Sequence, residues 1–333
     1  MDKILLAHGS GGRLSHELIK GYLLGYISNE ILCKMDDSAV ISLAGKMAFT
    51  TDSFVVKPLF FPGGDIGRLA ICGTVNDLAT SGARPLYLSL ALIIEEGFPL
   101  EDLQKIMESI RNTAVEAGIT IVTGDTKVVN HGGADGLFIN TSGIGVIPDN
   151  ANLSGANARP GDKIIINGTL GDHGVAVMAA RENLRFQIPV QSDCAPLNAL
   201  VESIMEFGEY IHCLRDPTRG GLATTLNELA GQSGTGMVIY EDALPVKDAV
   251  RSACDMLGLD PVYVANEGKM VVIAAPEKAD LILEAMRSHK YGRESAVIGE
   301  VTAKNPGRVI MKTLLGASRI IDMLSGELLP RIC

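Results

Sequence analysis

Aspartates recur at positions from which a carboxylate could reach a bound ligand. Asp36–Asp37, Asp52, Asp125 and Asp216 follow apolar segments or glycine turns, and Asp77 lies inside a helical pattern. Carboxylates at strand ends converge on one edge of a sheet, and Mg²⁺ prefers such hard oxygen ligands when it carries nucleotide phosphates. A turn or a helix cap is the more common role for any single aspartate. The five sites together favour metal binding.

Three glycine-containing loops accompany the aspartates. They read HGSGGR at 8–13, TGDTK at 123–127 and DPTRGG at 216–221, and the last one opens an apolar helix. A helix N-terminus offers free N–H groups and a positive dipole to a phosphate, and glycine permits close approach. Arg219 could add positive charge. Taken alone, each loop could also be an ordinary glycine-rich turn with no role in binding.

Three further side chains could do chemistry. Cys333 ends the chain, where a thiol is mobile and exposed, as a nucleophile or carrier requires; the alternative is an incidental free thiol. Lys127 and Glu267 flank apolar strands in glycine-containing turns, although a solvated surface role is more common for such residues. No role is predicted for the histidines beyond the first loop, namely His131, His173, His212 and His289.

Motif and composition exclude several protein classes. The chain has no P-loop, no dinucleotide-binding Gly-x-Gly-x-x-Gly, no Gly-x-Ser-x-Gly and no His-Glu-x-x-His motif. Its formal charge of −10 disfavours nucleic acid or an anionic membrane as partner. The six cysteines form no closely spaced pair, and no segment resembles a signal peptide or membrane helix, so we expect a cytoplasmic protein.

Hydrophobic periodicity predicts alternating strands and helices in two halves, and the mixed element lengths favour an α+β architecture over a (β/α)-barrel. The predicted strands are 47–49, 86–94, 119–122, 137–147, 163–166, 211–214, 237–240, 270–274, 296–301 and 308–311. The predicted helices are 67–81, 100–117, 173–181, 195–207, 220–230, 246–256 and 278–288.

The polar stretch 148–161, which contains proline and glycine, is the candidate linker between the halves. We therefore divide the chain into an N-terminal segment with the first glycine loop (1–35), an N-terminal domain (36–150), a C-terminal α/β domain (151–313) and a mobile tail (314–333). In the tail, Gly316 and Gly326 are candidate hinges around the apolar stretch 320–329, which could dock as a short helix.

Eight motifs together resemble the HypE family of hydrogenase maturation proteins. They are HGSGGR, DDSAV, TTDSFVV, VNDLATSGARP, TGDTKVV, DPTRGGLATTLNELA, NEGKM and the terminal PRIC. HypE proteins belong to the superfamily of aminoimidazole-ribonucleotide synthetase, selenophosphate synthetase and thiamine-monophosphate kinase. The resemblance covers essentially the whole chain, and the PRIC terminus is what points to HypE within the superfamily.

The resemblance implies a two-domain PurM-like fold and a homodimer. The N-terminal domains would pair into a β-barrel, with ATP and Mg²⁺ in a cleft at the interface. By motif, the metal ligands would be Asp37, Asp52, Asp77, Asp125 and Asp216. The same aspartates would contact the nucleotide together with Gly9, Gly11, Gly12, Asn76, Gly124, Thr126 and Thr218, and HGSGGR would close over it.

The resemblance also implies a reaction at the chain end. The carbamoyltransferase HypF would load a carbamoyl group onto Cys333, and the chain would use ATP to dehydrate it to a thiocyanate. Lys127 and Glu267 would act at the reacting centre. The tail would then pass cyanide to the iron-carrying HypC–HypD complex.

Two other functions remain open from the sequence. The first is a small-molecule kinase or synthetase of the same superfamily, in which Cys333 is idle. The second is a non-catalytic assembly scaffold that uses ATP as a conformational switch.

Overall fold

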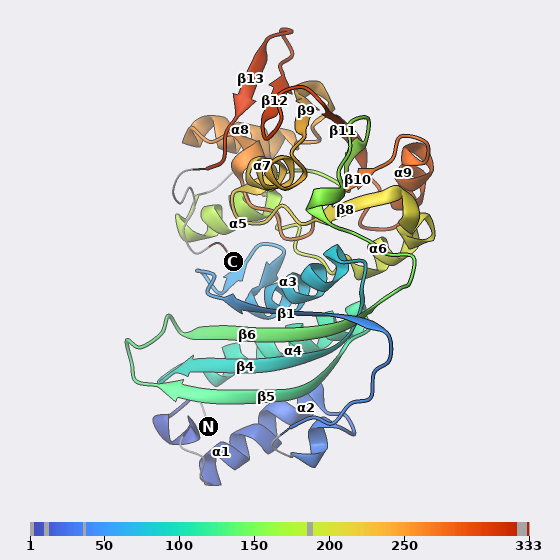
Figure 1. The fold of residues 1–333 in the computed structure, drawn as a ribbon. Helices are drawn as coiled ribbons and strands as arrows, with labels where there is room; N and C mark the ends of the chain where they lie inside the picture. Colours follow the sequence, from blue (N-terminus) through green and yellow to red (C-terminus); the bar gives the residue numbers. More distant parts are fainter. Residues whose placement is uncertain (1–2, 10–12, 36–37, 185–188, 325–331, 333) are drawn as a thin grey trace.

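Two sheet-based halves are stacked one above the other (Figure 1). The computed structural model describes residues 3–9, 13–35, 38–184, 189–324 and 332. No helix within these ranges has the length and apolar character needed to cross a membrane.

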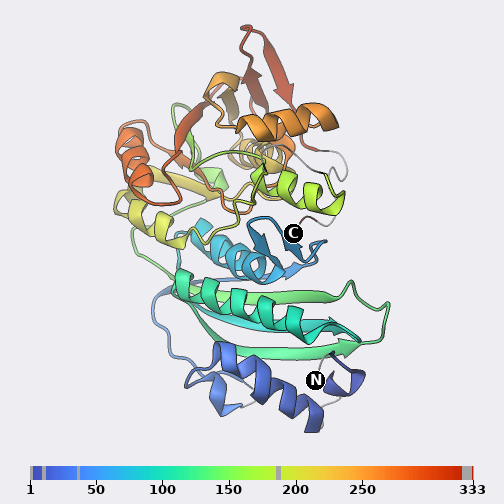
Figure 2. The same cartoon turned by 180° about the vertical axis from the view of Figure 1, so that it is seen from behind.

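A four-stranded sheet forms the centre of the N-terminal half. Its strands run in the order β1-β6-β4-β5, with β4 and β5 parallel and the other neighbours antiparallel. Helices α3 and α4 cover one face of this sheet, whereas no helix or strand of the described residues covers the other face (Figures 1 and 2). The bounds are β1 (Lys46–Phe54), α3 (Ile66–Thr80), β4 (Arg84–Glu95), α4 (Leu100–Ala117), β5 (Thr120–Val129) and β6 (Leu137–Ile147). The short strands β2 (Phe60–Phe61) and β3 (Gly64–Asp65) form a separate hairpin before α3.

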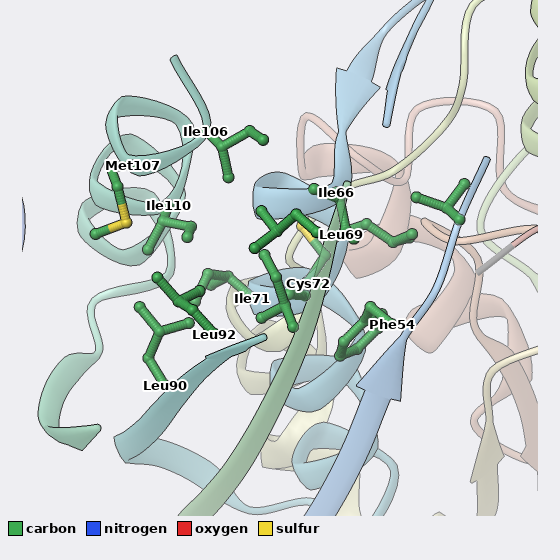
Figure 3. Close-up of a cluster of buried hydrophobic side chains, with 14 of the residues drawn as sticks. Phe54, Ile66, Leu69, Ile71, Cys72, Leu90, Leu92, Ile106, Met107 and Ile110 are labelled. Carbon is green, nitrogen blue, oxygen red and sulfur yellow. The ribbon is translucent and has the colours of Figure 1, made fainter. Parts of the chain in front are cut away.

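The core of this half lies between the sheet and its two helices. Figure 3 shows Leu69 and Ile71 of α3 facing Leu90 of β4 and Ile110 of α4, with Phe54 of β1 at the far side. Helix α3 is buried on nearly all sides because it also contacts the C-terminal half. Its sequence is correspondingly apolar around the whole helix.

A seven-stranded sheet in the order β13-β12-β9-β11-β7-β10-β8 forms the C-terminal half; all neighbours are antiparallel except β9 and β12. Its strands are β7 (Lys163–Ile166), β8 (Ile211–Arg215), β9 (Gly236–Tyr240), β10 (Val271–Ala274), β11 (Ala296–Thr302), β12 (Val309–Lys312) and β13 (Ser318–Ile321). Its α-helices are α5 (Asp172–Arg181), α6 (Asn198–Ile204), α7 (Gly221–Ser233), α8 (Asp248–Leu257) and α9 (Ala279–Ser288).

The N-terminal segment contains helices where the sequence analysis predicts only a glycine loop. Helix α1 (Arg13–Leu18), a π-helical turn (Ile19–Leu23) and α2 (Leu24–Ile27) follow a 3₁₀ turn (Leu6–Gly9). Their apolar side chains, including the buried Leu18 and Leu23, pack against the core of the N-terminal sheet.

Two predicted positions near strand ends are wrong. Asp216 does follow β8 directly, but Asp52 lies inside β1 and Asp125 inside β5. The loop predicted at TGDTK is part of β5, because this segment continues the parallel pairing with β4 as far as Val129. The predicted helix 195–207 is also too long, since α6 is followed by a 3₁₀ segment at Met205–Tyr210.

Part of the predicted mobile tail belongs to the C-terminal sheet. Strand β13 pairs with β12, and Gly316 lies in the tight turn between them, where its N–H bonds to the Thr313 carbonyl. A hinge at Gly316 and a helix beginning at Ile320 are therefore wrong. Gly326 and residues 325–329 lie outside the described residues.

Candidate functional site

Acidic side chains from both halves meet at the boundary between them. Asp52 of β1 and Asp77 of α3 come from the N-terminal half, and Asp216 comes from the loop after β8. Asp77, Asp216 and Thr218 line a cavity of about 660 Å³. The Thr50 hydroxyl donates a hydrogen bond of 3.0 Å to Asp77. These three predicted residues thus lie near one boundary, and their predicted role in metal binding stays a prediction.

The carboxylates disfavour each other's charged form. Burial and the nearby Asp77 and Asp52 carboxylates raise the pKa of Asp216 to about 7. Burial and the Asp52 carboxylate also raise the pKa of Asp77, against the hydrogen bond from Thr50. A bound cation would reduce this repulsion and stabilise the cluster.

Glu267 lies buried beside this cluster, and its backbone is fixed from two sides. Its N–H donates to Asp193 at 3.3 Å, and its carbonyl accepts from the Asn76 side chain at 3.2 Å. Its Oε1 is buried and has no hydrogen-bond partner among the residues that the structure describes. Burial, Cys194 and the neighbouring carboxylates raise the pKa of Glu267 well above its usual range. Gly268 is required next in the chain because a Cβ there would collide with the Asp193 backbone.

Two asparagines connect the loops that carry the acidic residues. The Asn266 amide donates to the carbonyl of Pro217, and its oxygen accepts the Gly171 N–H at the start of α5. The Asn76 amide bonds to the backbone of Ala195, Leu197 and Glu267. The Asn76 side chain thus joins the two halves in this structure, and its predicted contact with nucleotide stays a prediction.

Gly124, Asp125, Thr126 and Lys127 lie at the opposite edge of the N-terminal sheet. Asp52 is aligned with Thr141 of β6, Thr141 with Leu90 of β4, and Leu90 with Gly124 of β5. Three strand spacings separate the ends of this row, which is about 14 Å. One chain therefore does not bring Asp125 and Lys127 to the acidic cluster.

The β5 edge has its own cavity of about 330 Å³, which lies against the N-terminal segment. Gly124, Asp125, Thr126 and Lys127 all line it, and Lys127 bonds to Asp125 at 3.1 Å. The His8 side chain also lines this cavity, and its buried Nε2 has no hydrogen-bond partner. Gly9 ends the adjoining 3₁₀ turn. Gly11, Gly12, Asp37 and Cys333 lie outside the described residues.

The end of the chain enters the boundary between the halves. Ile332 is 2% exposed and belongs to the hydrophobic cluster of the N-terminal half. Its carbonyl bonds to Nε2 of the buried His173 at 2.8 Å. The sequence analysis predicts no role for His173, because a contact across 159 residues leaves no local pattern.

The acidic cluster has the donor chemistry that Mg²⁺ requires. Its side chains offer only carboxylate oxygens, and their mutual repulsion favours a divalent counter-ion. Within the described ranges, no three His, Cys, Asp or Glu side chains lie close enough together to enclose a metal ion. The oxygen donors suit Mg²⁺ in kind, but they do not form a metal cage by themselves, and Mg²⁺ binding at these aspartates stays a prediction.

Comparison with known proteins places the chain in a family. Residues 35–147 match the N-terminal domain of AIR synthase related proteins, and residues 159–312 match the C-terminal domain. The chain is 54% identical to carbamoyl dehydratase HypE of Azotobacter vinelandii over 329 residues, which cover 98% of this chain and 96% of that protein. The chain belongs to the HypE family. The resemblance predicted from the motifs is thus confirmed, as is the two-domain α+β PurM-like fold.

Solved structures of HypE proteins superpose closely on the chain. One HypE bound to ATP has a TM-score of 0.96 and 49% identity, with 99% of each chain covered. A HypE–HypF complex matches at a TM-score of 0.82 and 53% identity, covering 94% of this chain and 100% of the other. Thiamine-monophosphate kinase of Stenotrophomonas maltophilia shares the fold at 19% identity and a TM-score of 0.65, covering 87% and 90%.

Proposed function

We propose that this protein uses ATP to dehydrate a carbamoyl group on its own Cys333 to a thiocyanate, which supplies cyanide for the iron of a NiFe-hydrogenase. The observation that carries the proposal is the position of Ile332. The residue next to Cys333 is buried at the boundary between the halves, where the described acidic side chains also meet. Membership of the HypE family, whose relatives include a carbamoyl dehydratase and an ATP complex, supports the same reaction.

The reaction converts S–C(=O)–NH₂ into S–C≡N. The amide oxygen attacks the γ-phosphorus of ATP, so that an O–P bond forms and the bond to ADP breaks. One N–H proton leaves as the C=N bond forms. Loss of the second proton and cleavage of the C–O bond then release phosphate. The carbamoyl group thus loses two protons and one oxygen, and the oxygen leaves on phosphate.

Glu267 is the base in this proposal. Its Oε1 is buried and has no partner within the described part of the chain, as a group that is to accept a proton from the substrate nitrogen requires. A carboxylate with a raised pKa is a stronger base than an ordinary one once it is ionised. Lys127 is its electrostatic or proton-transfer partner.

Asp52, Asp77, Asp125 and Asp216, together with Asp37, would hold Mg²⁺ and the phosphates in this proposal. Bound Mg²⁺ would stabilise the charge that develops on the transferred phosphoryl group. Gly124 and Thr126 of β5, together with the HGSGGR segment and its glycines Gly9, Gly11 and Gly12, would hold the nucleotide at the cavity next to α1. Thr218 would contact the phosphates from the C-terminal half.

A homodimer would complete the site. Asp125 and Lys127 are three strands away from Asp52 within one chain, so a second chain must bring its β5 to the acidic cluster. The uncovered face of the N-terminal sheet is available for this pairing. Phe49 on that face is 73% exposed, and Met47 and Ile93 are also exposed. Two such faces packed together would form the β-barrel.

The proposed partners are those that the HypE resemblance implies. A carbamoyltransferase, HypF, would load Cys333, and a HypC–HypD complex would accept the cyanide. A HypE relative has been crystallised with HypF, which supports the first partnership. Both steps require the partner protein to reach the Cys333 sulfur.

Intact-mass spectrometry tests the reaction. The protein is incubated with ATP, Mg²⁺, carbamoyl phosphate and HypF, and we expect one cyano group on Cys333. A chain lacking Cys333 should stay unmodified, whereas Cys33→Ser, which removes an exposed cysteine, should react normally. If HypF is competent and ATP binds but no adduct forms, the dehydratase proposal is wrong. Phosphorylation of an added small molecule would then indicate a superfamily kinase, and ATP binding without turnover would indicate a scaffold.

A further inference from the structure

Ile332 is held by both its side chain and its backbone. The side chain lies in the same hydrophobic cluster as Phe61, Val177 and Ala265. The carbonyl oxygen lies 2.8 Å from Nε2 of His173. The residues of this cluster come from both halves of the molecule, so the position of Ile332 depends on how the two halves are placed.

The hydrogen bonds around His173 determine which nitrogen carries the proton. A carbonyl oxygen can only accept, so Nε2 must donate to Ile332. In the neutral ring, Nδ1 then accepts from the Ser192 hydroxyl at 2.8 Å, and the Ser192 oxygen in turn accepts the Cys194 N–H at 3.1 Å. Burial lowers the pKa of His173 despite the opposing effect of Asp193, which favours this neutral ring. Every donor in the series therefore meets an acceptor.

The ring itself is fixed in position. His173 lies in the first turn of α5, and the edge-to-face contact with Phe61 has a centroid distance of 5.4 Å and an interplanar angle of 89°. The Gly171 N–H immediately before α5 bonds to Asn266, next to Glu267. A buried ring held on several sides gives a donor of defined direction.

We propose that His173 and Ser192 form a seat for the C-terminal tail, and that His173 is a positioning residue for the dehydration of Cys333. The carbonyl that His173 holds belongs to the planar peptide unit that joins Ile332 to Cys333. The neighbouring Asp193 accepts the backbone N–H groups of Glu267 and Gly268. One short segment, 192–194, therefore orients both the tail and the backbone of the proposed base. This inference rests on the proposed function for its catalytic consequence, but the seat is a structural feature that can be measured separately.

Three variants of His173 distinguish the contribution of its hydrogen-bond donor from that of its ring. His173→Gln places an amide N–H where Nε2 lies, His173→Asn reaches only the position of Nδ1, and His173→Phe keeps the ring without a donor. We expect single-turnover conversion of carbamoyl to cyano to slow about 10- to 100-fold for Asn and Phe and to stay within about 5-fold of wild type for Gln. ATP binding and loading by HypF should not change. His131→Gln, at an exposed histidine, is the matched control.

The seat is also measured without turnover. Deuterium uptake of the peptide that contains Ile332 should rise in His173→Asn, in His173→Phe and in Ile332→Asp, which places a charge in the hydrophobic cluster. In ¹⁵N-histidine spectra, deletion of residues 332–333 should shift the His173 signals and leave those of His131 and His212 in place.

The outcomes distinguish this inference from the proposed function. If wild-type protein forms no thiocyanate but the uptake and spectral changes occur, the proposed function fails and the seat stands. If the wild-type protein reacts, and His173→Phe matches both its rate and its deuterium uptake at the peptide that contains Ile332, the proposed seat is wrong. Equal decreases of the conversion rate in His173→Gln and His173→Asn would also overturn the proposal, because the donor at the Nε2 position would then not matter.

Discussion

Glu267 is buried, and one of its carboxylate oxygens has no hydrogen-bond partner among the described residues. Replacement by glutamine keeps the shape of the side chain and removes its ability to accept a proton. We expect Glu267→Gln to bind ATP normally and to slow thiocyanate formation about 100- to 10,000-fold, as for the loss of a general base. Mass spectrometry of the carbamoylated protein under single-turnover conditions measures this.

Glu277→Gln, at an exposed glutamate beyond β10, is the control for Glu267→Gln and should react at the wild-type rate. A Glu267→Gln protein that no longer binds ATP would instead assign Glu267 to nucleotide binding.

Individual residues were predictable from the sequence to different degrees. Asp77, Asp216 and Glu267 lie in recognisable motifs, and the structure brings them together at one boundary. His173 lies in Gly171–Asp172–His173–Gly174, which indicates a turn and a helix start but not a partner at position 332. Such a contact depends on how the two halves close, and no local spacing encodes it.

Strand β5 is the element for which local sequence was most misleading. Gly124, Asp125 and Lys127 have low intrinsic strand propensity, and they predict a loop. The pairing with β4 outweighs this preference and extends the strand to Val129. The N-terminal helices are not predicted for a related reason, since their apolar spacing begins directly after a glycine-rich motif that favours a loop.

Gly124 provides a test of how β5 holds its residues. A Cβ at this position would overlap the Leu90 carbonyl of β4, so the two strands would have to separate. We expect Gly124→Ala to lower the free energy of unfolding by about 1 to 3 kcal/mol and to weaken ATP binding. Urea denaturation and calorimetric titration measure the two effects.

Gly231→Ala is the comparison for Gly124→Ala. Gly231 is an exposed helical glycine in α7 with open space around its Cα, so alanine should stabilise the protein by about 0.5 to 1 kcal/mol. Equal behaviour of the two variants would contradict the packing argument.

At the scale of the whole molecule, Glu116 connects the two halves. At the end of α4 it accepts hydrogen bonds from Arg68 at 3.0 Å and from Lys290 at 2.7 Å, and it also bonds to the Tyr291 hydroxyl. Burial alone would raise the pKa of Glu116, but these donors outweigh it and lower the pKa to about 2. The sequence predicted two halves and the linker region, but it could not predict this contact, which depends on their relative placement.

The lowered pKa of Glu116 implies a pH dependence of stability. The stabilisation is fully present above the ordinary glutamate pKa of 4.5 and is lost as the pH falls from there toward 2, because the folded state must then be protonated against its donors. We expect Glu116→Gln to cost about 1 to 2 kcal/mol at pH 7 and less with decreasing pH below 4.5. Urea denaturation at several pH values measures this.

Glu101→Gln serves as the comparison for Glu116→Gln, since Glu101 pairs with Lys105 on the surface of a single helix. Its effect should be much smaller than that of Glu116→Gln at every pH, because solvent screens an exposed ion pair. A constant difference between Glu116→Gln and wild type from pH 7 to pH 3 would rule out the role of the Glu116 charge.

The uncovered sheet face provides a test of self-association. Phe49→Asp puts a charge on this face, and we expect it to reduce the mass in solution from that of a dimer to that of a monomer, as measured by light scattering. Met256→Asp changes an exposed side chain on α8 and should leave the dimer intact. A monomeric wild-type protein would contradict the dimer.

The separation of Asp52 and Lys127 on opposite edges of one sheet has a genetic consequence. In the proposed dimer each site takes its acidic cluster from one subunit and its lysine from the other. Asp52→Asn and Lys127→Ala proteins would each be inactive, yet a heterodimer of the two would contain one site with both lesions and one intact site. Random remixing of the two dead proteins should therefore restore about one quarter of wild-type activity, because half of the dimers are mixed and each has one working site. Co-expression of the two alleles should likewise rescue hydrogenase maturation, whereas one chain carrying both substitutions should not.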